Sequence, residues 1–140
     1  MGYAFVDHTA DVAADLTGRS AADLFSSAAQ ALTDTITDLA AVRAIVTQSV
    51  TLDAGSLEDL LVDWLNELIY RFEVQNLLVS ASMVTVRDRD DRWYLEGSVA
   101  GEPFDPARHP SRVLVKGATY HGLQVTRQHG TWKTRIVFDI

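Results

Sequence analysis

The sequence has 140 residues, of which 47% are hydrophobic and 22% charged, and these values predict one globular domain spanning residues 1–140. The formal net charge of −7 argues against nonspecific nucleic-acid binding, and the absence of cysteine excludes disulfides, zinc thiolates and thiol nucleophiles. No apolar run approaches the roughly 18 residues of a membrane-spanning helix and no signal peptide is recognisable, so we expect a cytoplasmic protein without membrane contact.

The first third of the chain predicts two short strands, a helix and a third strand. Residues 3–6 and 12–16 have strand composition, and residues 42–52 alternate between apolar and polar side chains. Ser20 has the character of a helix N-cap, with Asp23 three residues later as a variant of the capping box. Apolar residues then follow at helical spacing, which predicts a helix over residues 20–37.

The strongest periodicity in the sequence predicts a second helix, over residues 56–73. Ser56 and Asp59 stand at capping distance, and the apolar residues that follow form one broad stripe. Trp64 and Leu68 lie in the middle of this stripe, so we expect both side chains to be buried. The opposite side of the helix is rich in carboxylates and resembles either a metal or catalytic array or a solvated face; we favour the solvated face.

Beyond Asn76 the pattern predicts strands only. Residues 78–86 and 93–100 flank a charged hairpin tip, three prolines place an irregular loop over residues 103–110, and residues 113–128 and 132–140 form two further strands. The expected fold class is α+β: a single domain with two helices packed on a largely antiparallel or mixed β-sheet of at least six strands.

The charges are unevenly distributed along the chain. Residues 1–86 carry three Lys or Arg against 12 Asp or Glu, whereas residues 107–140 carry six against one. The basic segment either meets a phosphate or an acidic partner, or complements the acidic half of the chain within the fold. We favour the second explanation.

Carboxylates near the two ends of the sequence suggest a metal site. Asp7, His8 and Asp11 lie between the first two strands, while Asp139 stands beside Ile140 with its main-chain carboxylate. If the two ends meet, these oxygens form an acidic pocket of the kind that hard cations such as Ca²⁺ or Mg²⁺ prefer. Alternatively, Asp139 is a solvated edge-strand residue and Asp11 a turn former.

Lys116 and His121 are the other candidates for chemistry. Lys116 lies in a glycine-containing segment and contacts a phosphate or is a surface lysine; His121 is a ligand, an acid–base group or a structural histidine. His109 and His129 fall in a loop and a turn, where we predict no role. The sequence contains no phosphate-binding loop, dinucleotide fingerprint, nucleophile elbow or two-histidine metal motif, so enzyme signatures are absent.

Four segments, in this order, resemble the archease family over nearly the whole chain. They are the segments at residues 7–11 (DHTAD), 60–70 (LLVDWLNELIY), 115–123 (VKGATYHGL) and 137–140 (VFDI). Each segment is a weak match by itself, and their order makes the resemblance specific. Gly117 stands where an alanine is usual in the family, and the segment 12–14 is smaller than is typical.

The resemblance implies a non-catalytic accessory protein. It implies that the chain activates an RtcB-type tRNA-splicing RNA ligase by promoting guanylylation and multiple turnover, and that it contacts RNA only indirectly. It implies a metal site formed by Asp11, Asp139 and Ile140, with Ca²⁺ as the ion and Mg²⁺ or Mn²⁺ as alternatives, and a role for Lys116 in activation. It therefore favours the metal pocket over the solvated interpretation, with Asp7 and His8 as additional candidates.

Two alternatives to this implied function remain open. Some members of the family are linked to a tRNA methyltransferase as chaperone-like partners, which would make the cation structural or incidental. A stand-alone metal-dependent phosphoesterase would use the same pocket, but it would need a general base and would turn over without a partner protein.

Overall fold

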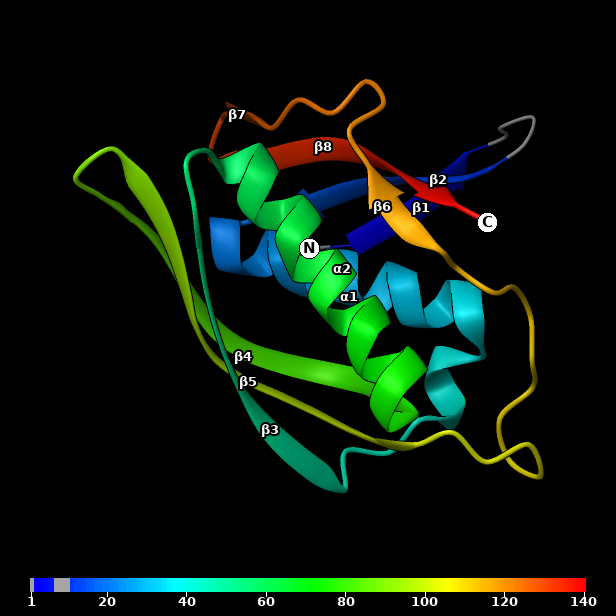
Figure 1. Cartoon of the computed structure of the whole chain (residues 1–140). Coiled ribbons are helices and arrows are strands. Elements are labelled where there is room, and N and C mark those ends of the chain that lie inside the picture. Colours follow the sequence, from blue (N-terminus) through cyan, green and yellow to red (C-terminus); the bar gives the residue numbers. More distant parts are fainter. Residues whose placement is uncertain (1, 7–10) are drawn as a thin grey trace.

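Two antiparallel β-sheets enclose two α-helices in the computed structural model, which describes residues 2–6 and 11–140 (Figure 1). One sheet has the order β1 (Gly2–Val6), β2 (Asp11–Gly18), β8 (Thr131–Asp139) and β6 (Gly117–Thr119), with β7 (Thr126–Gln128) also paired to β8. The other has the order β3 (Val46–Ala54), β5 (Arg92–Pro103) and β4 (Leu77–Arg89). The predicted α+β class with two helices is confirmed.

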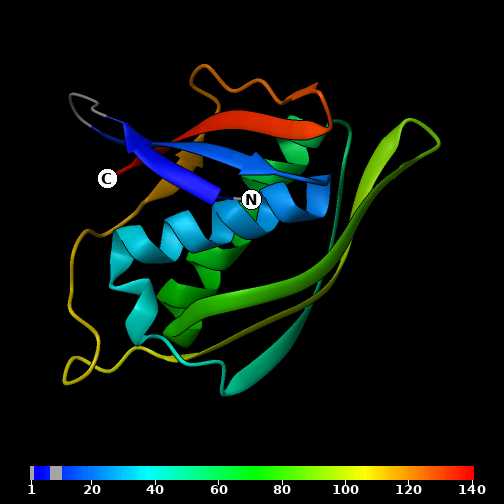
Figure 2. The same cartoon turned by 180° about the vertical axis from the view of Figure 1, so that it is seen from behind.

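The helices α1 (Ala21–Ile36) and α2 (Leu57–Gln75) lie between the sheets and contact strands of both (Figures 1 and 2). Both predicted N-caps are confirmed, since the hydroxyls of Ser20 and Ser56 each accept a hydrogen bond of 3.0 Å from the backbone N–H of the residue three positions later. Neither helix, nor any other among the described residues, is long and apolar enough to cross a membrane.

The apolar stripe of α2 forms the centre of the core. Trp64 is 0% exposed and Leu68 is 3% exposed, as the periodicity predicts. The indole N–H of Trp64 donates to the carbonyl of Phe25 at 2.9 Å, and the two rings lie 6.4 Å apart between centroids. This contact joins the two helices in the space between the sheets.

We expect Leu68→Ala to lower the free energy of unfolding by about 2–5 kcal/mol, because the truncation leaves a cavity among fully packed side chains. Tyr70→Ala is the matched control, because that side chain lies on the same helix and is 55% exposed. Chemical denaturation of both variants measures the difference. A loss below about 0.5 kcal/mol at Leu68 would contradict the burial of the stripe.

The prediction of one long strand over residues 113–128 is wrong. The segment forms only the three-residue strands β6 and β7, separated by an irregular stretch that contains Gly122 at φ 65°. Two of its backbone N–H groups bond to side chains of α2: Ala118 donates to Asn66 at 2.9 Å and Val125 donates to Glu58 at 3.0 Å. The polar face of α2 is therefore partly engaged by this segment, and the prediction of a solvated face holds only in part.

Two strand boundaries also differ from the prediction. Strand β3 begins at Val46, because residues Leu39–Ala41 form a 3₁₀-helix whose Asp38 side chain accepts a hydrogen bond from Ala40 N–H at 3.1 Å. Strand β5 continues to Pro103, which is tolerated because proline occupies the last strand residue. The predicted hairpin is confirmed, and its turn is formed by residues 90 and 91, both with positive φ.

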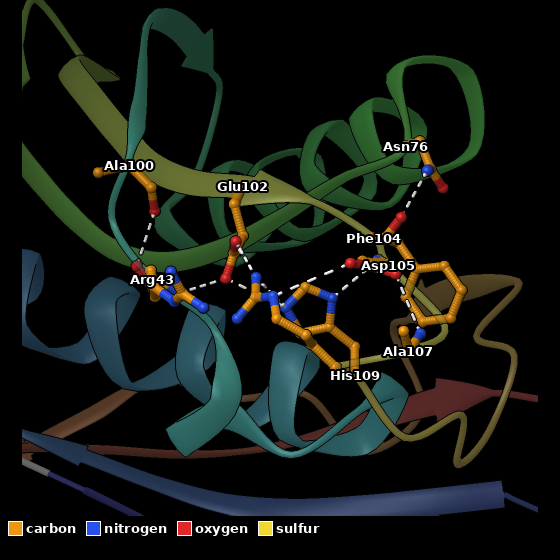
Figure 3. A network of polar contacts seen from close by, with 10 residues as sticks. Arg43, Asn76, Ala100, Glu102, Phe104, Asp105, Ala107 and His109 are labelled. Carbon is orange, nitrogen blue, oxygen red and sulfur yellow. Dashed lines mark hydrogen bonds and ion pairs between the residues drawn. The ribbon is translucent and has the colours of Figure 1, made fainter.

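A buried polar network anchors the loop after β5 (Figure 3), and it includes His109, for which the sequence predicted no role. Glu102 and His109 are 4% and 1% exposed. The Glu102 carboxylate accepts a hydrogen bond from Arg43 N–H at 2.7 Å, pairs with Arg108, and lies 3.1 Å from His109 Nε2. Asp105 N–H donates to His109 Nδ1 at 2.8 Å, so Nε2 carries the proton and donates to Glu102.

This network predicts acid sensitivity. Hydrogen bonds from Arg108, Arg43 and His109 lower the pKa of Glu102 from 4.5 to about 2. A carboxylate with a lowered folded-state pKa stabilises the fold above its unfolded pKa, and this contribution disappears as the pH falls from 4.5 to about 2.

We therefore expect Glu102→Gln to destabilise the fold at neutral pH, and the difference from the parent protein to shrink as the pH falls through that window. Denaturation at a series of pH values measures the difference. Arg43→Ala is the control, because Arg43 contributes its backbone N–H to the network. A difference independent of pH would contradict the assignment of the ionised carboxylate.

Candidate functional site

Asp11 and Asp139 lie directly opposite each other in neighbouring strands. They are register partners at the start of β2 and the end of β8, although 128 positions separate them in the sequence. Opposed residues of an antiparallel pair have Cα atoms about 4.5–5.5 Å apart, and their side chains project from the same face. The two ends of the described chain thus bring two carboxylates to one place, as the metal-pocket hypothesis requires.

The core identifies the face that carries this pair. Ala14 and Ile136 are register partners in the same two strands and belong to the hydrophobic core. Because side chains alternate along a strand, Asp11 and Asp139 lie on the other face. Asp139 is exposed and Asp11 is half-buried. This end of the sheet is therefore accessible to solvent at Asp139.

Three other register pairs of β2 and β8 occupy the same face, and one of them is an ion pair. Arg135 Nε lies 2.7 Å from Asp15 Oδ1, and the Arg135 guanidinium lowers the pKa of that carboxyl. Asp15 thus has a cation opposite it in the register, whereas Asp11 has a second carboxylate opposite it. A divalent cation bound beside this pair would interact favourably with both carboxylates.

Lys116 lies beside the carboxylate pair. Its backbone N–H donates to the carbonyl of Asp139 at 2.8 Å, and its side chain is exposed. The next residues form β6, in which Gly117 is the register partner of Asp139. The hydrogen bond from Ala118 to Asn66 holds β6 against α2. Asn66 is therefore a positioning residue for Lys116 that the sequence did not single out for this role.

The remaining candidates are placed as follows. Ile140 follows Asp139 and is 37% exposed. Asp7 and His8 lie outside the described residues. Within residues 2–6 and 11–140, no three His, Cys, Asp or Glu side chains gather closely enough to hold a metal ion. Among the described residues, the candidate site therefore consists of the side chains of Asp11 and Asp139, with the main chain of Ile140 next to them.

The donor set nevertheless fits a hard divalent cation. Oxygen atoms are the ligands that Ca²⁺, Mg²⁺ and Mn²⁺ prefer, and the carboxylates of Asp11 and Asp139 and the main chain of Ile140 offer such oxygens. The sequence contains no cysteine, so a thiolate-type site is excluded. The pair is hence a candidate cation site at an accessible end of strands β2 and β8.

The basic segment is partly explained by internal ion pairs. Arg112 lies 3.1 Å from Asp34, Arg135 pairs with Asp15, and Arg108 pairs with Glu102. For Arg112 and Arg135, whose partners belong to residues 1–86, the explanation by internal complementarity is confirmed; Arg108 pairs with a carboxylate outside that half. Lys116 has no salt bridge within 4.0 Å among the residues that the structure describes, and its side chain is exposed.

Comparison with known proteins assigns the family. The model of the Archease protein family (MTH1598/TM1083) matches residues 3–140. The archease of Methanopyrus kandleri is 38% identical over 140 residues and covers 100% of both chains, and that of Methanosarcina mazei is 33% identical over 99% of this chain and 95% of its own. This chain belongs to the archease family.

Solved structures agree with this assignment. The solution structure of protein 1598 from Methanobacterium thermoautotrophicum superimposes with a TM-score of 0.84 at 28% identity, over 99% of each chain. A crystal structure from Thermotoga maritima, described as an archease and possible chaperone, shares the fold with a TM-score of 0.64 at 20% identity, over 96% of this chain and 94% of its own.

Proposed function

We propose that this archease activates an RtcB-type tRNA-splicing RNA ligase by promoting the ligase's metal-dependent guanylylation and multiple turnover. The observation that carries the proposal is the cross-strand pair of Asp11 and Asp139, with Lys116 bonded to the same residue. The family supplies the class of protein, and the exposed Asp139 at the end of β8 supplies a surface that a larger enzyme can contact.

Each group at this end of the sheet has a separate task in the proposal. Asp11, Asp139 and the main chain of Ile140 would hold Ca²⁺, or Mg²⁺ or Mn²⁺ in its place. A divalent cation supplies charge neutralisation and orientation for phosphates during nucleotidyl transfer. Lys116 contributes a compact, strongly hydrated positive charge toward phosphate. Asn66 keeps the strand that follows Lys116 in register with Asp139.

The proposal assigns no chemistry to the archease itself. The sequence contains no nucleophile or cofactor motif, and neither carboxylate has a histidine opposite it in the register. We therefore expect the isolated protein neither to join RNA ends nor to hydrolyse GTP catalytically. A turnover assay with protein free of ligase measures this, and sustained GTP hydrolysis would favour the phosphoesterase alternative.

The direct test is RNA ligation by the cognate ligase at substrate in large excess, with and without this protein. The proposal expects the ligase alone to stop after about one turnover and the archease to restore continued ligation. Lys116→Ala should lower the rate, because the positive charge beside Asp139 is lost. Equal ligation with and without the archease would contradict the proposal.

A chaperone-like role is the second candidate, and the Thermotoga maritima relative is the reason to test it, since that protein is described as a possible chaperone. Such a role predicts that the archease suppresses aggregation of a tRNA methyltransferase partner. It also predicts that Asp139→Asn retains this effect, because the carboxylate pair is not needed for it. A parallel aggregation assay therefore separates the two functions.

A further inference from the structure

A groove lies between the two sheets at the end of the molecule opposite Asp139. It has a volume of about 490 Å³ and is lined by the hairpin of β4 and β5, the start of α1, and the strands β7 and β8. Trp132 lines it near the start of β8, seven residues from Asp139, which corresponds to about 23 Å along the strand. In Figure 1 this end is on the left and the C-terminus on the right.

The groove gathers arginines that lack counterions. Arg19, Arg87 and Arg127 line it from three separate parts of the chain, against the single carboxylate of Asp88. Among the described residues, none of these three guanidinium groups has a salt bridge within 4.0 Å. Six of the ten arginines in the sequence do form one: Arg71, Arg89, Arg92, Arg108, Arg112 and Arg135.

This concentration of positive charge is informative because the protein carries a formal charge of −7. The sequence has nineteen carboxylate side chains, yet three of the four arginines that form no ion pair with another described residue line one groove. Guanidinium groups are suited to phosphate, since their planar N–H donors match phosphate oxygens in pairs. The charge pattern thus indicates a phosphate-bearing anion.

Aromatic surface beside the arginines indicates what the phosphate is attached to. Trp93 and Trp132 line the groove from opposite sheets, and both are half-buried. The guanidinium carbon of Arg127 lies 5.2 Å from the centre of the Trp132 ring, a cation–π arrangement. Indole rings with an accessible face stack on nucleobases with little dependence on sequence.

We propose that this groove binds a nucleoside phosphate, with the base stacked on tryptophan and the phosphate held by Arg19, Arg87 and Arg127. Two sources share this chemistry, a free nucleotide and the phosphorylated end of a single strand. The groove is separate from the carboxylate pair, and this inference does not depend on the proposed activation of the ligase. This positive charge is confined to the groove, so it does not conflict with the negative net charge that argues against nonspecific nucleic-acid binding.

Tryptophan fluorescence provides the test, because two of the three tryptophans line the groove and Trp64 is fully buried. Titration with adenosine 5′-monophosphate should quench the emission saturably. Adenosine and inorganic phosphate should each bind at least about tenfold more weakly, since each lacks one of the two recognised parts. A 5′-phosphorylated tetranucleotide that binds more tightly than the mononucleotide assigns the site to strand ends; equal binding assigns it to free nucleotides.

Matched variants test the arginines. Arg87→Gln and Arg127→Gln should each weaken binding by about tenfold, the loss of one charge-assisted contact. Arg89→Gln is the control, because Arg89 lies two residues along β4 and pairs with Asp90 at 3.6 Å. Circular dichroism verifies that each variant is folded. Asp139→Asn should bind normally, so failure of this proposal is distinguishable from failure of the ligase proposal.

Three results would overturn the proposal. The first is the absence of saturable quenching by the mononucleotide and the oligonucleotide. The second is inorganic phosphate binding as tightly as adenosine 5′-monophosphate, which would leave the tryptophans without a role. The third is a loss of affinity in Arg89→Gln equal to that in Arg87→Gln, which would reduce the effect to general surface charge.

Discussion

Asp139→Asn is expected to abolish activation of the ligase while the fold remains intact. The substitution removes one of two carboxylates that face each other across β2 and β8, and with it the charge that a divalent cation needs there. The side chain is exposed, so the change of shape disturbs no packing. Asp11→Asn should have the same effect. The measurement is multiple-turnover ligation at saturating archease.

Stability provides a second readout that does not depend on the ligase. Ca²⁺ should raise the melting temperature of the parent protein, because a ligand that binds only the folded state stabilises it, and this increase should vanish in Asp139→Asn. In metal-free buffer the variant should be at least as stable as the parent, since the repulsion between the carboxylates is gone. Chelation of divalent ions from the parent should reproduce the behaviour of the variant.

Asp15→Asn is the matched control for both readouts. Asp15 lies on the same strand and face as Asp11, but it pairs with Arg135 and takes no part in the proposed site. This variant should activate the ligase normally and retain the Ca²⁺ response. Extending the chain beyond Ile140 tests the main-chain carboxylate and should impair activation. Full activation by Asp139→Asn would remove the mechanism.

Gly101→Ala is expected to destabilise the protein by about 3 kcal/mol or more, the largest loss of stability that we predict for a small substitution. Gly101 faces the place where β4 carries an extra residue, since the register of β4 and β5 shifts between Val79 and Ala81. A Cβ at Gly101 would overlap the carbonyl oxygen of Leu78 and lie 3.0 Å from Val79 Cα. These atoms are backbone, so the two strands would have to separate.

Gly55→Ala is the control for this substitution. A Cβ at Gly55 meets no atom within 4 Å, so its free energy of unfolding should change by less than about 0.5 kcal/mol. Chemical denaturation compares the two variants. A loss of less than about 1 kcal/mol in Gly101→Ala would show that the bulge adapts to a side chain.

The helices are the part of the fold that could be predicted from the sequence. The signals for α2 are local: Ser56 and Asp59 stand three residues apart, and the apolar stripe repeats with the period of the helix. Such signals need no knowledge of distant residues. The prediction of one long strand over residues 113–128 was wrong because the conformation of this segment depends on distant residues. Its backbone bonds to Asn66 and Glu58 on α2, and a local pattern does not contain these partners.

Burial of polar residues was likewise decided by tertiary structure. His109 stands in a proline-rich loop and has no distinguishing neighbours in the sequence. Its burial depends on Glu102, whose charge requires Arg108 and the backbone of Arg43 to be present at the same place. The groove with Arg19, Arg87 and Arg127 arises in the same way, from three segments that meet only in the folded chain.

For the candidate site, the sequence by itself determined the residue types: carboxylates near both ends, a lysine in a glycine-containing segment, and the order of segments that is typical of archeases. Only the tertiary structure decided that Asp11 and Asp139 are register partners and that Lys116 bonds to the second of them. The reason is physical. Strand register depends on pairing between residues that are distant along the chain, and a shift by one residue would place the two carboxylates on opposite faces of the sheet.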